Sequence, residues 1–143
     1  MQVWCLLILM TLSAFLVSQN KESADNSYNA SQLDVIASNM LIYSSALSTY
    51  AKANPGLSTA VSDQSLTLPA WFVRIVGVGN YISAGKAYVY YSGKPELLTI
   101  LADKTESVTV GKNQSGVLVS PRWGATSIAI PAAIPNGAVV YVL

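Results

Sequence analysis

The amino-acid sequence predicts an α+β fold in which one long amphipathic helix packs on an antiparallel β-sheet of four to six strands. Three observations predict it. A helical stripe of apolar residues runs from Ser31 to Asn54. Most of the chain after this point consists of short β-type runs separated by Gly, Pro and Asn. A separate apolar segment, Val3 to Val17, precedes the helix.

The predicted helix has the spacing of a half-buried helix. Its apolar residues recur at i, i+3, i+4 and i+7, and they are Leu33, Ile36, Ala37, Met40, Tyr43, Leu47, Tyr50 and Ala51. Polar residues fill most of the other positions: Gln32, Asp34, Ser38, Asn39, Ser45, Ser48, Thr49 and Lys52. Asn29 or Ser31 is expected to cap the first turn, and Pro55 with Gly56 is expected to end the helix.

Composition excludes several classes of function. The 143 residues are 52% hydrophobic and 10% charged, with a formal net charge of +1, so the chain lacks the basic surface of a nucleic-acid-binding protein. It contains no histidine and one cysteine, Cys5. A disulfide framework and a Cys/His metal site are therefore excluded within one chain. Low charge with many Ser, Thr, Gly and Val residues suits an exported protein.

The N-terminal apolar segment predicts export. Val3–Val17 is apolar except for Thr11 and Ser13, and its length matches a signal-peptide core but falls short of the ~20 residues of a spanning helix. A basic n-region and a clear cleavage site are missing. We predict that residues 1–18 are an export signal or membrane anchor, with a buried N-terminal helix as the alternative. Residues 19–30 are a polar tether or a weak continuation of the helix, and residues 31–143 form a single α+β domain.

The region just after the helix is expected to alternate between loops and strands. A short strand is expected at Leu66–Leu68. The next apolar run is Trp71–Val78, and Gly77, Gly79 and Asn80 are expected to end it. Tyr81–Tyr91 is expected to form one strand because it is rich in Tyr and Val. Within it the two faces would be Ala87, Val89 and Tyr91 on one side and Tyr88 and Tyr90 on the other.

The last third of the chain predicts one short helix and two hairpins. Pro95–Asp103 is expected to be helical, with Pro95 at the first position. Ser107–Val110 and Val117–Ser120 are expected to pair through a loop at residues 111–116. Ser127–Ile130 and Ala138–Leu143 flank a loop containing Asn136-Gly137, which is a tight-turn signal. The apolar ending VVYVL predicts that the last strand is central or buried.

Two triplets fit the sequon for N-glycosylation. They are Asn29-Ala30-Ser31 and Asn113-Gln114-Ser115. Such triplets arise by chance in chains rich in Asn and Ser, and they matter only in a secretory host.

No pattern in the chain predicts catalysis. Ser83–Lys86 matches S-x-x-K, in which a lysine helps to activate a serine, but Ser18–Lys21 matches it as well. That motif requires a helix, whereas Ser83 lies in a predicted strand, and the partner motifs are absent. The seven carboxylates are scattered, and a Ser-His-Asp arrangement is impossible without histidine. We therefore predict a protein that is not an enzyme and that has no catalytic residue, cofactor or metal.

Aromatic residues are the remaining candidates for function. Aromatic side chains that pack in the core would leave no functional surface, whereas exposed Trp and Tyr anchor protein interfaces. Trp71 follows Pro69, and Trp123 precedes Gly124, so both are expected to be exposed at breaks. The candidate partner-binding residues are Trp71, Phe72, Tyr81 and Trp123.

The order of features resembles a known family, the small PilM proteins of thin-pilus (type IVb) operons. The matching segments cover nearly the whole chain: the apolar N-terminus, the Ser31–Asn54 helix, LPAW at 68–71, GKAYVY at 85–90, GVLVSP at 116–121 and the tail from Ile130-Pro131 to Val140. The resemblance implies a pilus-biogenesis accessory protein at the periplasmic side of the bacterial inner membrane, which it would contact through its N-terminus. Its partners would be a pilin or other pilus-assembly proteins, and no catalytic or binding residues are carried over.

The predicted architecture is also similar to that of pilins, which place a long N-terminal helix on an antiparallel sheet. The chain lacks the short basic leader that ends in glycine, a glutamate at the fifth mature position and a C-terminal cysteine pair, which argues against a major subunit. A minor pilin or pilus-tip subunit remains an alternative function, as does a small exported enzyme or inhibitor. The oligomeric state and the partner stay open.

Overall fold

The computed structural model describes the backbone of residues 2–143 and the side chains of residues 21–143. The chain divides into two compact units, Met1–Leu33 and Asp34–Leu143. The prediction that residues 1–18 are an export signal or anchor depends on side chains that lie outside the described residues. In the part of the chain that the structure describes, no helix has an apolar stretch long enough to cross a membrane.

Helix α1 runs from Gln2 to Ala53, so it begins well before the predicted start. The expected caps Asn29 and Ser31 lie inside the helix, and their prediction as caps is wrong. The physical reason is that residues 19–30 contain neither Gly nor Pro, which leaves nothing to interrupt the helix. The predicted end is confirmed within one residue, because α1 stops before Asn54, whose side-chain amide donates to the Tyr50 carbonyl at 2.9 Å.

The apolar stripe of α1 forms the core of the second unit. Six of the eight predicted side chains are buried, namely Ile36, Ala37, Met40, Tyr43, Leu47 and Ala51. Leu33 and Tyr50 are half-buried. Ser48 was expected on the polar side but is buried, as is Ser44, whose hydroxyl donates to the Leu41 carbonyl at 2.7 Å. The stripe is therefore wider than its apolar residues indicate.

The sheet has seven antiparallel strands rather than four to six, in the order β1-β2-β3-β7-β4-β5-β6. Its strands are β1 (Ser58–Thr59), β2 (Val78–Ser83), β3 (Lys86–Tyr91), β4 (Val110–Gln114), β5 (Val117–Ser120), β6 (Gly124–Ala129) and β7 (Val139–Val142). The count is higher because the two-residue β1 pairs with β2 and because residues 78–91 form two strands. The prediction that β7 is central is confirmed, since it lies between β3 and β4.

The predicted single strand Tyr81–Tyr91 is wrong, because this segment is part of a hairpin. The chain turns at Ala84 and Gly85, where φ is 50° and 75°, as a tight hairpin turn requires. The expected break at Gly79 and Asn80 lies inside β2. A Cβ on Gly79 would lie 2.3 Å from the Tyr90 ring of the paired strand, so the glycine makes room for a cross-strand aromatic.

The C-terminal hairpin prediction is also wrong. The strands β6 and β7 do not pair with each other, because β6 pairs with β5, and β7 is inserted between β3 and β4. The segment between them, from Ile130 to Ala138, crosses the second face of the sheet. There it buries Ile130, Ile134 and Ala138 with side chains from the strands, namely Tyr88, Leu118, Val140 and Val142. The loop between β4 and β5 is a tight turn at Ser115 and Gly116, both with positive φ, rather than six residues long.

Two short helices complete the second unit. Helix α2, Leu97–Thr105, confirms the predicted helix with a shift of two residues. Lys104 of α2 forms an ion pair with Asp34 of α1, with Nζ 2.9 Å from Oδ1. The strand expected at Leu66–Leu68 is absent, and a 3-10 helix, Asp63–Ser65, precedes this position.

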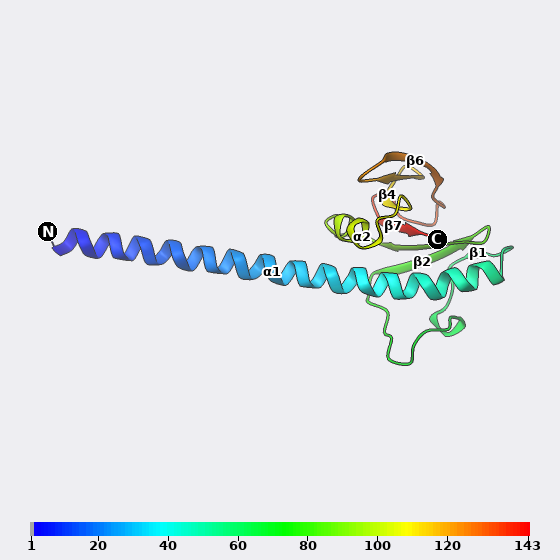
Figure 1. Ribbon diagram of the computed structural model, residues 1–143, viewed down its shortest axis with the longest axis horizontal. Coiled ribbons are helices and arrows are strands. Elements are labelled where there is room, and N and C mark those ends of the chain that lie inside the picture. Colours follow the sequence, from blue (N-terminus) through cyan, green and yellow to red (C-terminus); the bar gives the residue numbers. More distant parts are fainter. Residues whose placement is uncertain (1) are drawn as a thin grey trace. The chain divides into compact units, whose positions relative to one another are not determined.

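Figure 1 shows the sheet on one side of α1 and the chain between β1 and β2 on the other.

Burial of α1 predicts which substitutions destabilise the second unit. Met40 and Leu47 are fully buried, and Ser45 is exposed. Changing Met40 or Leu47 to Ala should lower the free energy of unfolding by about 2–5 kcal/mol, because each leaves a cavity. Ser45→Ala should change it by less than about 0.5 kcal/mol. Urea denaturation measures all three, and equal small effects would mean that α1 does not carry the core.

Candidate protein-contact surface

A long loop between β1 and β2, residues 60–77, is fastened to α1 on the side away from the sheet (Figure 1). We call it the 60–77 loop. It holds two of the four candidate residues, Trp71 and Phe72. Because a loop without regular backbone pairing must be held by side chains, its contacts decide which of its residues are presented to solvent.

The first set of contacts that holds the loop is a polar network centred on Tyr43 and Asn80. The Tyr43 hydroxyl donates to Asp63 Oδ1 and accepts from Asn80 Nδ2, both at 2.7 Å. Asn80 also pairs with the backbone of Val61, accepting from its N–H at 2.7 Å and donating to its carbonyl at 2.9 Å. Arg74 Nε donates to Asp63 Oδ2 at 2.9 Å. The network therefore ties α1, β2 and both halves of the loop together.

Burial affects the acid–base properties of this network. Desolvation, followed by the hydrogen bond and negative charge of Asp63, raises the pKa of Tyr43 well above its ordinary value of 10.0. Arg74 and Asn80 act in the opposite direction but do not cancel the rise. The folded protein therefore keeps Tyr43 protonated into alkaline solution, where its hydroxyl still donates the hydrogen bond to Asp63.

The second set of contacts comes from Asn39, which projects from α1 toward the loop. Its Nδ2 donates to the Val73 carbonyl at 2.8 Å, and its Oδ1 accepts from the Ile75 N–H at 3.1 Å. One side-chain amide thus satisfies a carbonyl and an N–H two residues apart, as a neighbouring strand would. The backbone of residues 73–75 is therefore held against the helix.

The third set of contacts between the loop and α1 involves aromatic rings. The Phe72 ring stacks on the Tyr43 ring with centroids 6.0 Å apart and an interplanar angle of 11°. Arg74 Cζ lies 5.6 Å from the centroid of the same Tyr43 ring, within range of a cation–π contact. Trp71 meets Phe72 edge to face at 6.4 Å. Phe72 and Arg74 therefore point toward α1, and they support the residues between and beside them.

With the loop held by these contacts, three of its large apolar side chains are exposed. Trp71, Val73 and Val76 have relative exposures of 71%, 79% and 93%. We call these three residues the Trp71 patch. Beside it, a hollow of about 410 Å³ between the loop and α1 is lined by Val35, Ile42, Trp71 and Val73 among others. Along this segment, the inward side chains of Phe72 and Arg74 alternate with the outward side chains of Trp71 and Val73.

The four candidate residues lie in three places. Trp71 and Phe72 are neighbours in the 60–77 loop, although Phe72 is half-buried and supports Trp71. Trp123 is 66% exposed between β5 and β6, as expected, next to Arg122, which forms an ion pair with Asp103 of α2 at 2.7 Å. Tyr81 follows Asn80 on β2, so it faces the opposite side of the sheet from α1, where its hydroxyl donates to the Ser58 carbonyl at 3.2 Å.

Sequence reasoning missed Val73, Val76 and the residues that hold the loop. The run WFVRIVGV reads as a buried segment because only one of its residues is charged. Its exposure depends on Asn39 and Asn80, which come from other parts of the chain. No local signal in the sequence connects these two asparagines with the run.

The motif Ser83–Lys86 is divided by a hairpin turn. Ser83 ends β2 and Lys86 begins β3, and the two residues are cross-strand partners. The Ser83 hydroxyl lies 3.4 Å from the Ser58 hydroxyl, which donates to it. Among residues 21–143, no group of three or more His, Cys, Asp or Glu side chains lies close enough to hold a metal ion.

The sequon asparagine Asn113 is a structural residue. It is 3% exposed, its amide donates to the carbonyls of Ile134 and Pro135 at 3.0 and 3.1 Å, and its Oδ1 accepts from the Gly116 N–H at 3.0 Å. Its amide nitrogen is therefore occupied by hydrogen bonds in the folded chain, and the side chain fastens the segment that covers the second face of the sheet.

Comparison with known proteins finds relatives for most of the chain. The PilM family model matches residues 7–142. A crystal structure of a PilM protein from Pseudomonas aeruginosa 2192 is 43% identical with a TM-score of 0.51, and the match covers 78% of this chain and 93% of that chain. A crystal structure of protein PilM from Escherichia coli B7A has a TM-score of 0.61 at 22% identity, covering 80% and 94%, and this second match shows the fold alone. No curated protein sequence matches the chain.

The raised pKa of Tyr43 predicts a loss of stability in alkaline solution. Above about pH 10 the unfolded chain releases the Tyr43 proton while the folded chain keeps it, so the unfolded state binds fewer protons and the free energy of unfolding falls as pH rises. In Tyr43→Phe this fall should be shallower, although the variant should be less stable at neutral pH by about 1 kcal/mol or more. Tyr88, whose pKa burial also raises, keeps part of the fall in both proteins.

The measurement is urea denaturation of both proteins at several values between pH 8 and pH 11. Parallel pH profiles for the parent chain and Tyr43→Phe would show that Tyr43 does not stay protonated in the folded state.

Proposed function

The chain belongs to the PilM family of pilus-related proteins, and from that membership we propose that it is a non-enzymatic assembly factor of a type IVb pilus. It acts by contact with a pilin or another pilus-assembly protein. The N-terminal segment, residues 1–18, directs it to the inner membrane, and the domain that follows works on the periplasmic side. Family membership supports the link to the pilus, and the loop geometry supports the mode of action.

The Trp71 patch is the observation that carries the contact mechanism. Three large apolar side chains exposed on one loop cost solvation free energy in the isolated protein, and such patches on soluble proteins mark interaction sites. The loop is held by Asn39, Asp63 and Asn80, so these contacts form the surface before a partner binds. A preformed surface loses little conformational entropy on binding, which favours affinity.

The sheet edges support contact through side chains rather than through strand addition. The edge strand β1 has two residues, and beyond it the Asn80 side chain already pairs with Val61. At the other edge, β6 is irregular, because its register against β5 shifts between Val117 and Val119. There the Thr126 hydroxyl donates to the Leu118 carbonyl at 2.7 Å. Short and bulged edges are poor templates for a partner strand.

The contact mechanism predicts that the Trp71 patch is required and that Ser83 and Lys86 are not. Trp71→Ala and Val76→Asp should each impair pilus assembly or pilus-dependent transfer, because truncating an interface anchor commonly costs about 2 kcal/mol or more of binding free energy. The double variant Ser83→Ala with Lys86→Ala should assemble pili normally. Pilus assembly is measured by electron microscopy and by transfer frequency in a complemented deletion strain.

Two controls make this experiment decisive. Val108→Asp introduces the same charge at another exposed valine and should have no effect. Circular dichroism shows whether each variant is folded, since a misfolded chain gives the same loss. Folded Trp71→Ala and Val76→Asp variants with normal pili, beside a folded Ser83/Lys86 double variant without pili, would overturn the proposal in favour of an enzyme.

The proposed location has its own test. Alkaline phosphatase fused after Leu143 should be active, because the enzyme folds only when it is exported and residues 1–18 have the hydrophobicity of a translocation signal. The fusion protein should sediment with the membrane fraction, or appear in the periplasm if residues 1–18 are cleaved. An inactive fusion in the soluble cytoplasmic fraction would contradict the location while leaving a pilus-related role open.

A further inference from the structure

A groove runs between α1 and the 60–77 loop, on the side of the helix that faces away from the sheet. Its C-terminal part has a volume of about 710 Å³, and its N-terminal part is the hollow of about 410 Å³ beside Trp71. Ile42 lines both parts, which therefore form one trough from Asp34 to Ala53. These two residues are 19 positions apart, or about 28 Å along a helix. We call this trough the α1 groove.

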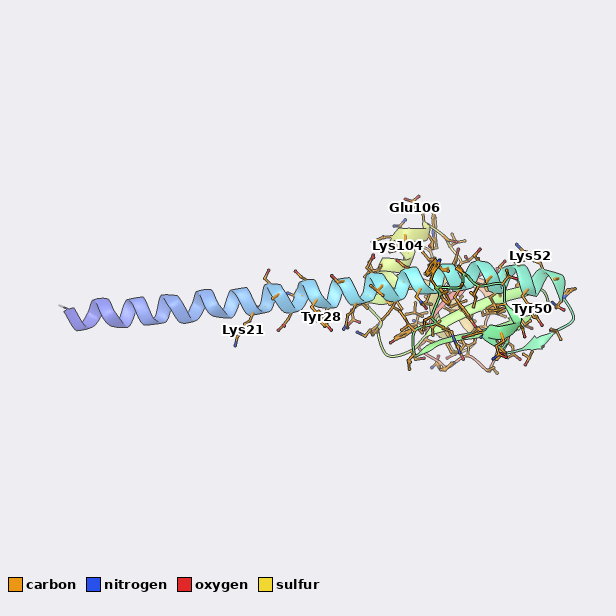
Figure 2. The ribbon with its side chains drawn as sticks, turned by 90° about the horizontal axis from the view of Figure 1, so that it is seen from below. Lys21, Tyr28, Tyr50, Lys52, Lys104 and Glu106 are labelled. Atoms are coloured by element: carbon orange, nitrogen blue, oxygen red, sulfur yellow. The ribbon has the colours of Figure 1, made fainter. Side chains whose placement is uncertain are left out.

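The lining of the α1 groove is almost free of charge. Among the residues that line it, Asp34 alone is charged, and it lies at one end and is paired with Lys104 of α2 at 2.9 Å. Tyr50 lines the groove, whereas Lys52 is two residues further along and projects to the other side of α1 (Figure 2). A charged group that entered the groove would lose its hydration without gaining a partner. The surface that fills the groove must therefore be uncharged.

Backbone groups that an added strand would need are already paired on both sides of the α1 groove. Those of α1 are paired within the helix. On the loop, Asn39 occupies the Val73 carbonyl and the Ile75 N–H, and the Phe72 N–H donates to the Pro69 carbonyl at 2.9 Å. An extended segment in the groove would bury its own N–H and C=O groups without partners, whereas a helix pairs these groups internally. The backbone therefore favours a helix as the occupant.

We propose that the pilus-assembly partner binds through an uncharged helix of its own, which lies along the α1 groove. Recognition of a helix in an apolar groove is a common mode of protein contact. Small residues on the floor of the groove, such as Ser45, Ala46 and Thr49, let the two helix axes approach to the usual distance of about 8–10 Å. The exposed Trp71 at the rim packs against the side of the bound helix.

This inference rests on the proposed function and deepens it, because it names the kind of segment that the partner presents. The α1 groove is continuous with the Trp71 patch, since Trp71 and Val73 also line the hollow at its N-terminal end. Val76 lines neither part of the groove. Val76→Asp therefore tests the proposed function alone, whereas changes inside the groove test the helix.

The first experiment measures the rise per residue of the partner segment. The photo-reactive amino acid p-benzoylphenylalanine replaces Val35 or Ala53, at the two ends of the groove, in the full chain and in cells that assemble pili. Mass spectrometry then locates the cross-linked residues. The two positions are 18 residues apart on α1, so they should reach partner residues about 18 apart if the partner is helical. An extended partner rises about 3.3 Å per residue and would give sites about eight apart.

The same reagent at Val76 and at Thr99 supplies the controls. Val76 should cross-link to the same partner protein, and Thr99, at an exposed position of α2, should not. Sites about eight residues apart, or cross-links from the groove to a second copy of this chain, would overturn the inference. So would a Val76 cross-link to the partner without any from Val35 and Ala53, although the proposed function would stand. No cross-link from any of the three positions would count against both.

The second experiment blocks the middle of the groove. Ser45 is exposed on its floor, so Ser45→Arg should leave the chain folded while it places a long charged side chain where the helix would lie. Pilus-dependent transfer should fall by about tenfold or more, because the charge is desolvated on binding. Thr99→Arg, the matched control, should transfer normally, and circular dichroism shows whether both variants are folded. Normal transfer by a folded Ser45→Arg variant, beside impaired transfer by Val76→Asp, would overturn the helix and leave the proposed function in place.

Discussion

The structure depends on one buried side chain, Asn80. It lies in the interior of β2, yet its amide pairs with the backbone of Val61 in both directions and donates to the Tyr43 hydroxyl. A buried amide without partners would cost about 1–3 kcal/mol, so the loop must come to Asn80 for this part of the sheet to be stable. Position, burial and pairing of the 60–77 loop follow from that requirement.

That constraint also accounts for the apolar surface. Once Val61 is held at β2 and Asp63 is held by Tyr43 and Arg74, the rest of the loop has to return along α1 to reach β2. Asn39 meets its backbone there, which turns Phe72 inward and Trp71 and Val73 outward. The exposed side chains are thus a consequence of how the backbone is satisfied. Because these side chains are largely exposed, the isolated fold gains little from their hydrophobic character, and this supports the contact function that we propose.

Several elements could be predicted from the sequence because their signals are local. The buried stripe of α1, its end at Pro55, the helix at Leu97–Thr105 and the strand character of residues 86–91 and 139–142 each follow from spacing or from turn residues. The predicted start of α1 is wrong because Asn29 and Ser31 are possible caps, whereas the absence of Gly and Pro from residues 19–30 lets the helix continue through them. The predicted break at Gly79 and Asn80 is wrong, because both residues lie inside β2. There Gly79 makes room for the Tyr90 ring and Asn80 pairs with Val61 and Tyr43.

The sequence by itself determined the α+β class, the burial of one side of α1, the lack of histidine and of a cysteine pair, and the resemblance to PilM proteins. Tertiary structure alone decided that β7 lies between β3 and β4, that Tyr81 faces away from α1 while Trp71 is exposed beside it, and that Asn39, Asp63 and Asn80 hold one loop. The reason is physical: periodicity records which side of an element is buried, whereas pairing between distant strands and side chains depends on contacts across many residues, which no local pattern encodes.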